Sequence, residues 1–167
     1  MEDKETITVF CQKDEKALTV SLSSLKGLGQ FLTRIAEGGF KETAENLLVT
    51  QFSTTAFSLV LQVFSGTVSL PQLATKLQTE TLLEVCEALD HYGYPPQQLQ
   101  KGLGDLEKKW TRDTKDDYAL AELLVRFSEK GIQLVVASWA VYRYGYINYL
   151  EEAVKVRNHF LHIFSFD

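Results

Sequence analysis

Residues 6–22 read TITVFCQKDEKALTVSL, and this stretch decides the fold class. Its two segments, 6–12 and 17–22, alternate apolar with polar residues and are rich in β-branched side chains, a pattern that predicts strands. The four charged residues between them predict a turn, so the two strands should pair as a hairpin. A further apolar run at 47–50 predicts one more strand. The result is a small three-stranded mixed sheet, made of a hairpin plus one strand.

Apolar residues at three- and four-residue spacing predict helices around this sheet. The first is expected over residues 23–37 and should end at Gly38-Gly39. A second should open at Ser53 or Thr54, either of which can cap a helix, and stop at Ser65-Gly66. Two more are expected, one around 73–77 and one from Thr79 to Gly93. The sequence therefore predicts an α+β fold in which helices cover a small sheet.

Tyr94-Pro95-Pro96 is the clearest boundary signal in the chain, because proline lacks an amide donor and biases the residue before it away from helix. The prediction is a sheet-containing domain over 5–100 and a mainly helical extension over 101–167. In the extension, helices are expected over 97–110, 113–130, 132–146 and 148–166. The segment 132–146 is apolar nearly all round, so a buried strand over 132–142 is the alternative.

Composition limits the classes of partner. The chain has 167 residues, of which 45% are hydrophobic, enough for one compact domain or a domain with an appendage. Its net charge is −5, and residues 1–100 hold 7 basic against 12 acidic residues. No basic run is able to neutralise several phosphates together, so we expect no direct binding to nucleic acid and none to an anionic membrane.

Cys11 and Cys86 each lie in an apolar run, which predicts buried structural thiols. No stretch resembles a signal peptide, and no run of 18 apolar residues is present. We therefore expect a reducing compartment, nucleus or cytoplasm.

No motif for catalysis or for cofactor binding is complete in this sequence. Gly27-Leu28-Gly29 follows a predicted strand, but Leu32 stands where a dinucleotide site needs its third glycine. His159 and His162 share a helical face, but only the carboxylates Glu151 and Glu152, one or two turns upstream, accompany them, and the remaining ligands of a metal site are lacking. The acidic run 113–117 lacks the glycine of a calcium loop and is better explained as a capped helix start. The prediction is a protein that is not an enzyme, with no cofactor and no metal.

Three groups of residues give the first hundred positions a resemblance to the BTB/POZ family. The hairpin and the first helix carry apolar and small residues at the family's spacing, the next helix ends in an aromatic-Ser-Gly sequence, and closing helices follow. The residues are Leu18, Val20, Ser21, Leu25, Gly29, Phe31 and Leu32; Phe57, Leu61, Phe64, Ser65, Gly66, Val68 and Leu70; and Leu82, Leu83, Cys86, Leu89 and Leu99.

The resemblance implies a non-catalytic protein–protein interaction or oligomerisation module. Such a module acts as a scaffold or adaptor, in a cullin-3 type ubiquitin ligase or in transcriptional regulation. The implied partner is cullin-3, a co-repressor or another BTB chain. The helical stretch after Pro96 is similar to the segments that follow BTB domains in cullin-3 adaptors, and the oligomeric state stays open.

The sequence allows three other interpretations. Tyr142, Tyr144, Tyr146 and Tyr149 are predicted to bind a protein partner, since tyrosine is enriched at interface cores; the alternative is that these rings fill the core of the second half. A second function is an α+β ligand-binding or catalytic domain whose pocket is lined by 132–146. A third is a piece of a larger factor, because 160–166 end the chain on apolar residues.

Overall fold

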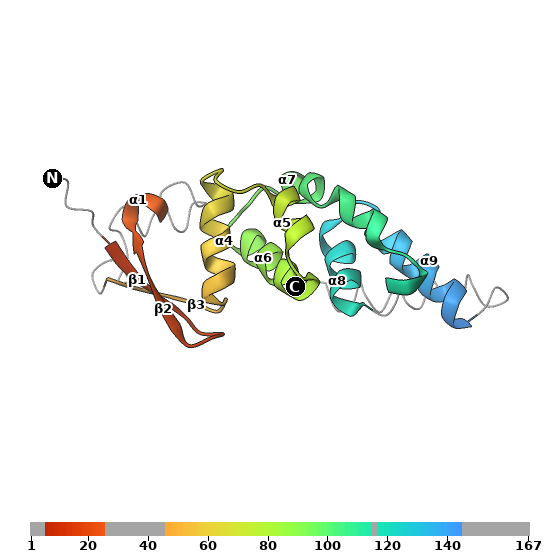
Figure 1. Ribbon diagram of the computed structural model, residues 1–167, viewed down its shortest axis with the longest axis horizontal. Coiled ribbons are helices and arrows are strands. Elements are labelled where there is room, and N and C mark those ends of the chain that lie inside the picture. Colours follow the sequence, from red (N-terminus) through yellow and green to blue (C-terminus); the bar gives the residue numbers. More distant parts are fainter. Residues whose placement is uncertain (1–5, 26–45, 115–116, 145–167) are drawn as a thin grey trace. The chain divides into compact units, whose positions relative to one another are not determined.

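A computed structural model describes residues 6–25, 46–114 and 117–144 (Figure 1). The chain forms two compact units. The first comprises Met1–Leu73 and Glu84–Pro95, and the second comprises Ala74–Leu83 and Pro96–Asp167. The separation of 5–100 and 101–167 into two domains stays a prediction.

The first unit contains the predicted three-stranded mixed sheet. Strands β1 (Thr6–Cys11) and β2 (Lys16–Ser21) form the antiparallel hairpin, and β3 (Leu47–Thr50) pairs parallel to β1. The strand order is β2-β1-β3, so β1 is central. Burial alternates along β1 and β3, which gives the sheet one covered face, with Ile7, Val9 and Leu48, and one exposed face. The α+β fold class is confirmed.

Helix α1 (Leu22–Leu25) follows β2 directly, and the end of the helix predicted over 23–37 lies outside the described residues. Helix α4 (Thr54–Phe64) starts and stops where the sequence predicts. The Ser53 side chain caps its start by accepting a hydrogen bond from the Ala56 amide. Just beyond the helix, Gly66 adopts a φ of 73°, which side chains other than glycine's rarely tolerate.

Tyr92 ties β3 and α4 to the end of helix α6 (Thr79–His91). Its hydroxyl shares a 2.7 Å hydrogen bond with the Thr50 hydroxyl, and its ring meets Phe57 edge-on at 5.7 Å. Both Tyr92 and Phe57 are buried, so this contact belongs to the core of the first unit. Helix α5 (Leu70–Lys76) and α6 each run from one unit into the other.

The second unit is helical throughout its described part. It contains α7 (Pro96–Gly102), two 3-10 helices at Gly104–Lys109 and Arg112–Thr114, α8 (Tyr118–Phe127) and α9 (Gly131–Tyr144). Pro96 is the first residue of α7, a position where its missing amide is harmless. The helix predicted over 97–110 is divided at residue 103, where the backbone tightens into a 3-10 turn.

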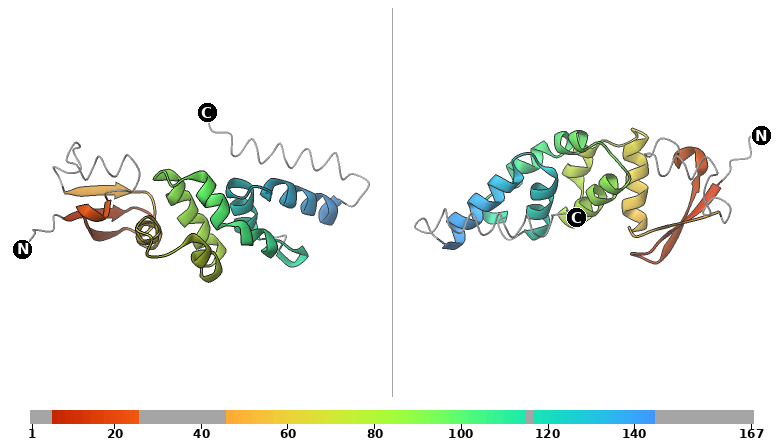
Figure 2. Two further views of the ribbon diagram at one scale, coloured as in Figure 1. Left: turned by 90° about the horizontal axis from the view of Figure 1, so that it is seen from above. Right: turned by 180° about the vertical axis from the view of Figure 1, so that it is seen from behind.

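Two further predictions about this unit are settled. Asp117 caps α8 by accepting a 2.9 Å hydrogen bond from the Leu120 amide, so the acidic run is a capped helix start. The alternative of a buried strand over 132–142 is wrong, because these residues belong to α9, which lies beside α8 (Figure 2). None of the helices among the described residues is long and apolar enough to cross a membrane.

Candidate functional site

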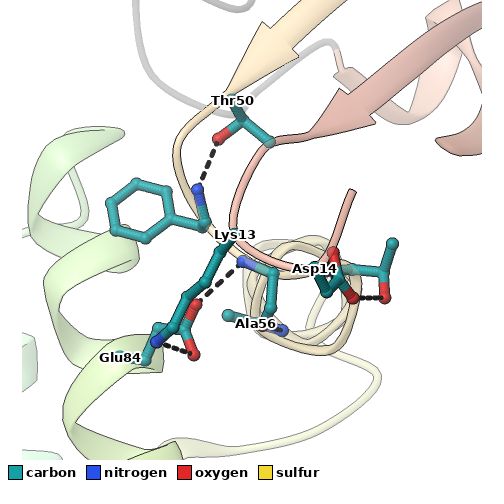
Figure 3. Close-up of polar contacts among 8 residues, drawn as sticks. Lys13, Asp14, Thr50, Ala56 and Glu84 are labelled. Carbon is teal, nitrogen blue, oxygen red and sulfur yellow. Dashed lines mark hydrogen bonds and ion pairs between the residues drawn. The ribbon is translucent and has the colours of Figure 1, made fainter. Parts of the chain in front are cut away.

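The turn of the hairpin is held to the start of α4 and to α6 by a group of five residues (Figure 3). We call this group the hairpin clamp; it consists of Lys13, Asp14, Ser53, Thr54 and Glu84. The Asp14 carboxylate accepts hydrogen bonds from the Thr54 amide at 3.2 Å and from the Thr54 hydroxyl at 2.6 Å. The Glu84 carboxylate accepts a 2.8 Å hydrogen bond from the Ser53 amide and pairs with Lys13 at 2.8 Å.

The charges of the hairpin clamp suit a structural role. The Thr54 hydroxyl and amide hold the pKa of Asp14 below its ordinary value, aided by Lys16. Burial alone would raise the pKa of Glu84, but hydrogen bonds from Lys13 and Ser53 outweigh it and lower that pKa. Both groups are therefore anionic at neutral pH and already engaged by backbone amides at a helix start. A carboxylate fixed in this way is a poor proton donor.

The two cysteines are buried, as predicted from their apolar neighbours. Cys11 lies on the covered face of the sheet with 0% exposure. Burial, reinforced by the negative charges of Asp14 and Glu84, raises the pKa of its thiol to about 11. The thiolate is the nucleophilic form, so this thiol is unreactive near neutral pH.

We expect Cys11 to resist alkylation in the folded protein. At pH 8 only about a thousandth of a thiol with this pKa is ionised, and the buried position of Cys11 also keeps the reagent away from its sulfur. Iodoacetamide followed by mass spectrometry should leave Cys11 unlabelled in buffer and label it fully in urea. Rapid labelling at pH 8 without loss of structure would show that the thiol is exposed.

The exposed face of the sheet is uncharged and partly apolar. We call it the outer sheet face; it consists of Thr6, Thr8, Phe10, Ala17, Thr19, Ser21, Leu47 and Val49. In the strand register Phe10 stands between Ala17 and Val49, and Thr8 stands between Thr19 and Leu47, so these side chains share one face. Phe10 is 37%, Leu47 38% and Val49 49% exposed. Three large apolar side chains thus gather on one open surface, a feature of protein-binding sites.

The sequence predicted the strands that carry this face but did not single out Phe10, Leu47 or Val49. Alternation divides the residues of a strand between two faces, but the strand's own sequence does not show which face the other elements of the fold will cover. The exposed apolar surface could have been found from the apolar outward positions of β1 and β3. Pairing these positions, however, requires the register between two strands that are far apart in the chain.

The tyrosines predicted to bind a partner are not assembled into a site by the described residues. The backbone of Tyr142 and Tyr144 belongs to α9, and Tyr146 and Tyr149 lie outside the described residues. His159, His162 and the segment 27–32 also lie outside them. Tyr118, the first residue of α8, is 66% exposed.

Polar atoms inside the described parts of the chain are satisfied. Every buried side-chain nitrogen and oxygen there has a hydrogen-bond partner. Across residues 6–25, 46–114 and 117–144, no group of three or more His, Cys, Asp and Glu residues is placed to hold a metal ion. Comparison with known proteins gives no match to a family model, to a curated protein or to a solved structure.

Proposed function

We propose that this chain is a non-catalytic protein–protein interaction module of BTB/POZ-like type, which docks a partner on the outer sheet face. The observation that carries the proposal is the gathering of Phe10, Leu47 and Val49 on one uncharged, exposed surface of a small sheet. An apolar surface rimmed by hydroxyl side chains favours another polypeptide, because its burial removes apolar area from water and breaks no ion pair.

The order of elements from β1 to α6 supports the BTB/POZ-like type. That resemblance implies a hairpin leading into a helix, a third strand and then closing helices. The order β1, β2, α1, β3, α4, α5 and α6 is consistent with it. The partner is then cullin-3, a co-repressor or another BTB chain, and the setting is a ubiquitin ligase or transcriptional regulation in the nucleus or cytoplasm.

A measurement of solution mass tests the proposal. Multi-angle light scattering of the chain alone, with cullin-3 and with a co-repressor fragment should reveal a complex in at least one sample. No complex in any sample, together with a rise in melting temperature on adding a nucleotide or a metal ion, would favour a ligand-binding or catalytic domain instead.

Replacing Phe10 with lysine should weaken partner binding by about tenfold or more. A buried aromatic residue at the centre of an interface commonly contributes at least that much, and the new charge would have to be desolvated. Isothermal titration with the partner found above measures the change. Thr55→Lys, at an exposed position of α4, is the matched control and should bind as the wild type does. Equal binding by all three proteins would place the docking surface elsewhere.

A further inference from the structure

The outer sheet face is small. Its three strands have 6, 6 and 4 residues. Neighbouring strands lie about 4.8 Å apart and each residue advances a strand by about 3.3 Å, so the face measures roughly 10 Å by 13–20 Å. This is on the order of 200 Å², whereas a stable contact between two folded proteins takes about 800 Å² from each of them. The face therefore fits a single secondary-structure element of a partner.

The largest exposed side chain of this face lies on the central strand. Phe10 belongs to β1, which has β2 on one side and β3 on the other. In the register Phe10 stands between Ala17 and Val49, each about 4.8 Å away. A partner strand added at either edge would lie two strand intervals from β1 and would leave Phe10 uncovered. Covering Phe10 together with Leu47 and Val49 requires an element that lies over the face.

The face of a sheet offers no backbone hydrogen bonds to such an element. The amides and carbonyls of a strand point sideways to its neighbours, and only side chains point out of the sheet. An extended segment on the face would take its own backbone groups out of water without giving them partners, which costs free energy for each group. An α-helix satisfies its backbone internally, and its diameter of about 10–12 Å matches the width of three strands.

The side chains of the face determine which side of a helix fits. The outer sheet face has apolar side chains and hydroxyl groups but no charged group. A charged residue of the partner turned toward it would lose water and gain no ion pair. The side of the helix that meets the sheet is therefore apolar and uncharged, while its other side is exposed and polar. Such a helix is amphipathic.

We infer that the outer sheet face binds one amphipathic α-helix of a partner protein, about three turns long, whose apolar stripe packs over Phe10, Leu47 and Val49. The length follows from the pitch of about 5.4 Å and the extent of the face. This inference rests on the proposed function and names the element that the partner contributes. The bound helix adds a layer to the sheet on the side opposite its covered face, which holds Val9 and Leu48.

Selection from two peptide libraries tests the inference. Both libraries hold peptides of about 14 residues, enough for three to four turns, with the same average composition. In the first library apolar residues recur at three- and four-residue spacing, which gives a helical stripe; in the second they alternate, as in a strand. Peptides that bind the chain should come from the helical library. Binding peptides from the alternating library alone, or from neither, would overturn the inference.

Phe10→Lys should weaken the binding of a selected helical peptide by about tenfold or more in isothermal titration, because the new charge under the stripe would have to be desolvated. Thr55→Lys, at an exposed position of α4, is the matched control and should bind as the wild type does. Equal binding by all three proteins overturns the inference. Self-association in sedimentation velocity that Phe10→Lys abolishes also overturns it, since the face would then belong to a second copy.

Amide hydrogen exchange of the wild-type chain, read by NMR, gives a second measurement that needs no variant. The Asn46 and Thr50 carbonyls accept hydrogen bonds from β1, so alternation directs the Leu47 and Val49 amides away from β1. A bound helix should shift the ring signals of Phe10 and leave the exchange of these two amides unchanged. Protection of both amides would show that the peptide adds a strand at the edge, which contradicts the inference.

The inference and the proposed function fail on different results. If no helical peptide binds, but cullin-3 or a co-repressor forms a complex that Phe10→Lys weakens, the proposed function stands and the inference is wrong. If neither a peptide nor a protein binds, both are wrong.

Discussion

Gly131→Ala should destabilise the second unit by about 3 kcal/mol or more, the largest effect we expect from a single methyl group in this chain. Gly131 begins α9 and lies against the backbone of α8. A β-carbon at this position would overlap the carbonyl carbon and oxygen of Leu124. These are backbone atoms inside a helix, so they cannot swing aside as the end of a side chain does. Relief requires α8 and α9 to move apart, which opens the contact between them.

Tryptophan fluorescence during urea unfolding measures this change selectively, because Trp110 and Trp139 are the two tryptophans of the chain and both belong to the second unit. Gly104→Ala is the matched control. A β-carbon at Gly104 meets nothing within 4 Å, so the free energy of unfolding should stay within about 0.5 kcal/mol of the wild-type value. An unchanged midpoint for Gly131→Ala would mean that α8 and α9 do not approach closely at this residue.

Glu84→Ala should destabilise the first unit by about 2 kcal/mol. The side chain of Glu84 is nearly buried, and its removal leaves the Ser53 amide without its acceptor at the start of α4. Lys13, whose side chain is 57% exposed, loses its partner but regains water, so most of the cost comes from the amide. Urea unfolding followed by circular dichroism measures the loss. The tryptophan signal from the second unit can be recorded in the same titration.

Two variants separate the components of this effect. Glu84→Gln keeps an oxygen for Ser53 but removes the charge, so it should cost less than Glu84→Ala. Glu80→Ala, at an exposed position of the same helix, should change stability by less than about 0.5 kcal/mol. If Glu84→Ala is no more destabilising than Glu80→Ala, the hairpin clamp contributes little to the fold.

The stability that Glu84 contributes to the first unit depends on pH. The folded-state pKa of Glu84 is below its ordinary value of 4.5, so the folded protein binds this proton less readily than the unfolded chain. The stability from Glu84 is therefore complete above pH 4.5 and is lost as pH falls through the lower, folded-state pKa. Glu84→Gln should show a smaller loss of stability over that acid range than the wild type does.

Local patterns were sufficient for much of the fold. The hairpin, β3 and both ends of α4 follow from alternation, spacing and caps, each of which is encoded within a few residues. The segment 132–142 was ambiguous because a residue run that is apolar on all sides has neither a two-residue nor a 3.6-residue period. Its assignment to α9 depends on packing against α8.

Long-range pairing explains what the sequence did not reveal about the candidate site. Glu84 and Ser53 are 31 residues apart, and neither has a neighbour in sequence that marks the other. Phe10 and Val49 become neighbours only through the parallel register of β1 and β3. Only their density in the sequence led to the prediction that the four tyrosines bind a partner, and their role stays a prediction.

The path of the chain through α6 sets how this protein can be dissected. Residues Ala74–Leu83 belong to the second unit although they precede Glu84–Pro95 of the first. In the second unit the Lys109 ammonium donates a hydrogen bond to the Ala74 carbonyl, and the Thr79 hydroxyl donates one to the Asp117 carboxylate. A fragment that starts at Pro96 would lack both partners, and one that ends at Pro95 would carry them with nothing to bind. No single cleavage point yields two intact halves, so a truncation that abolishes binding would not by itself locate the binding surface.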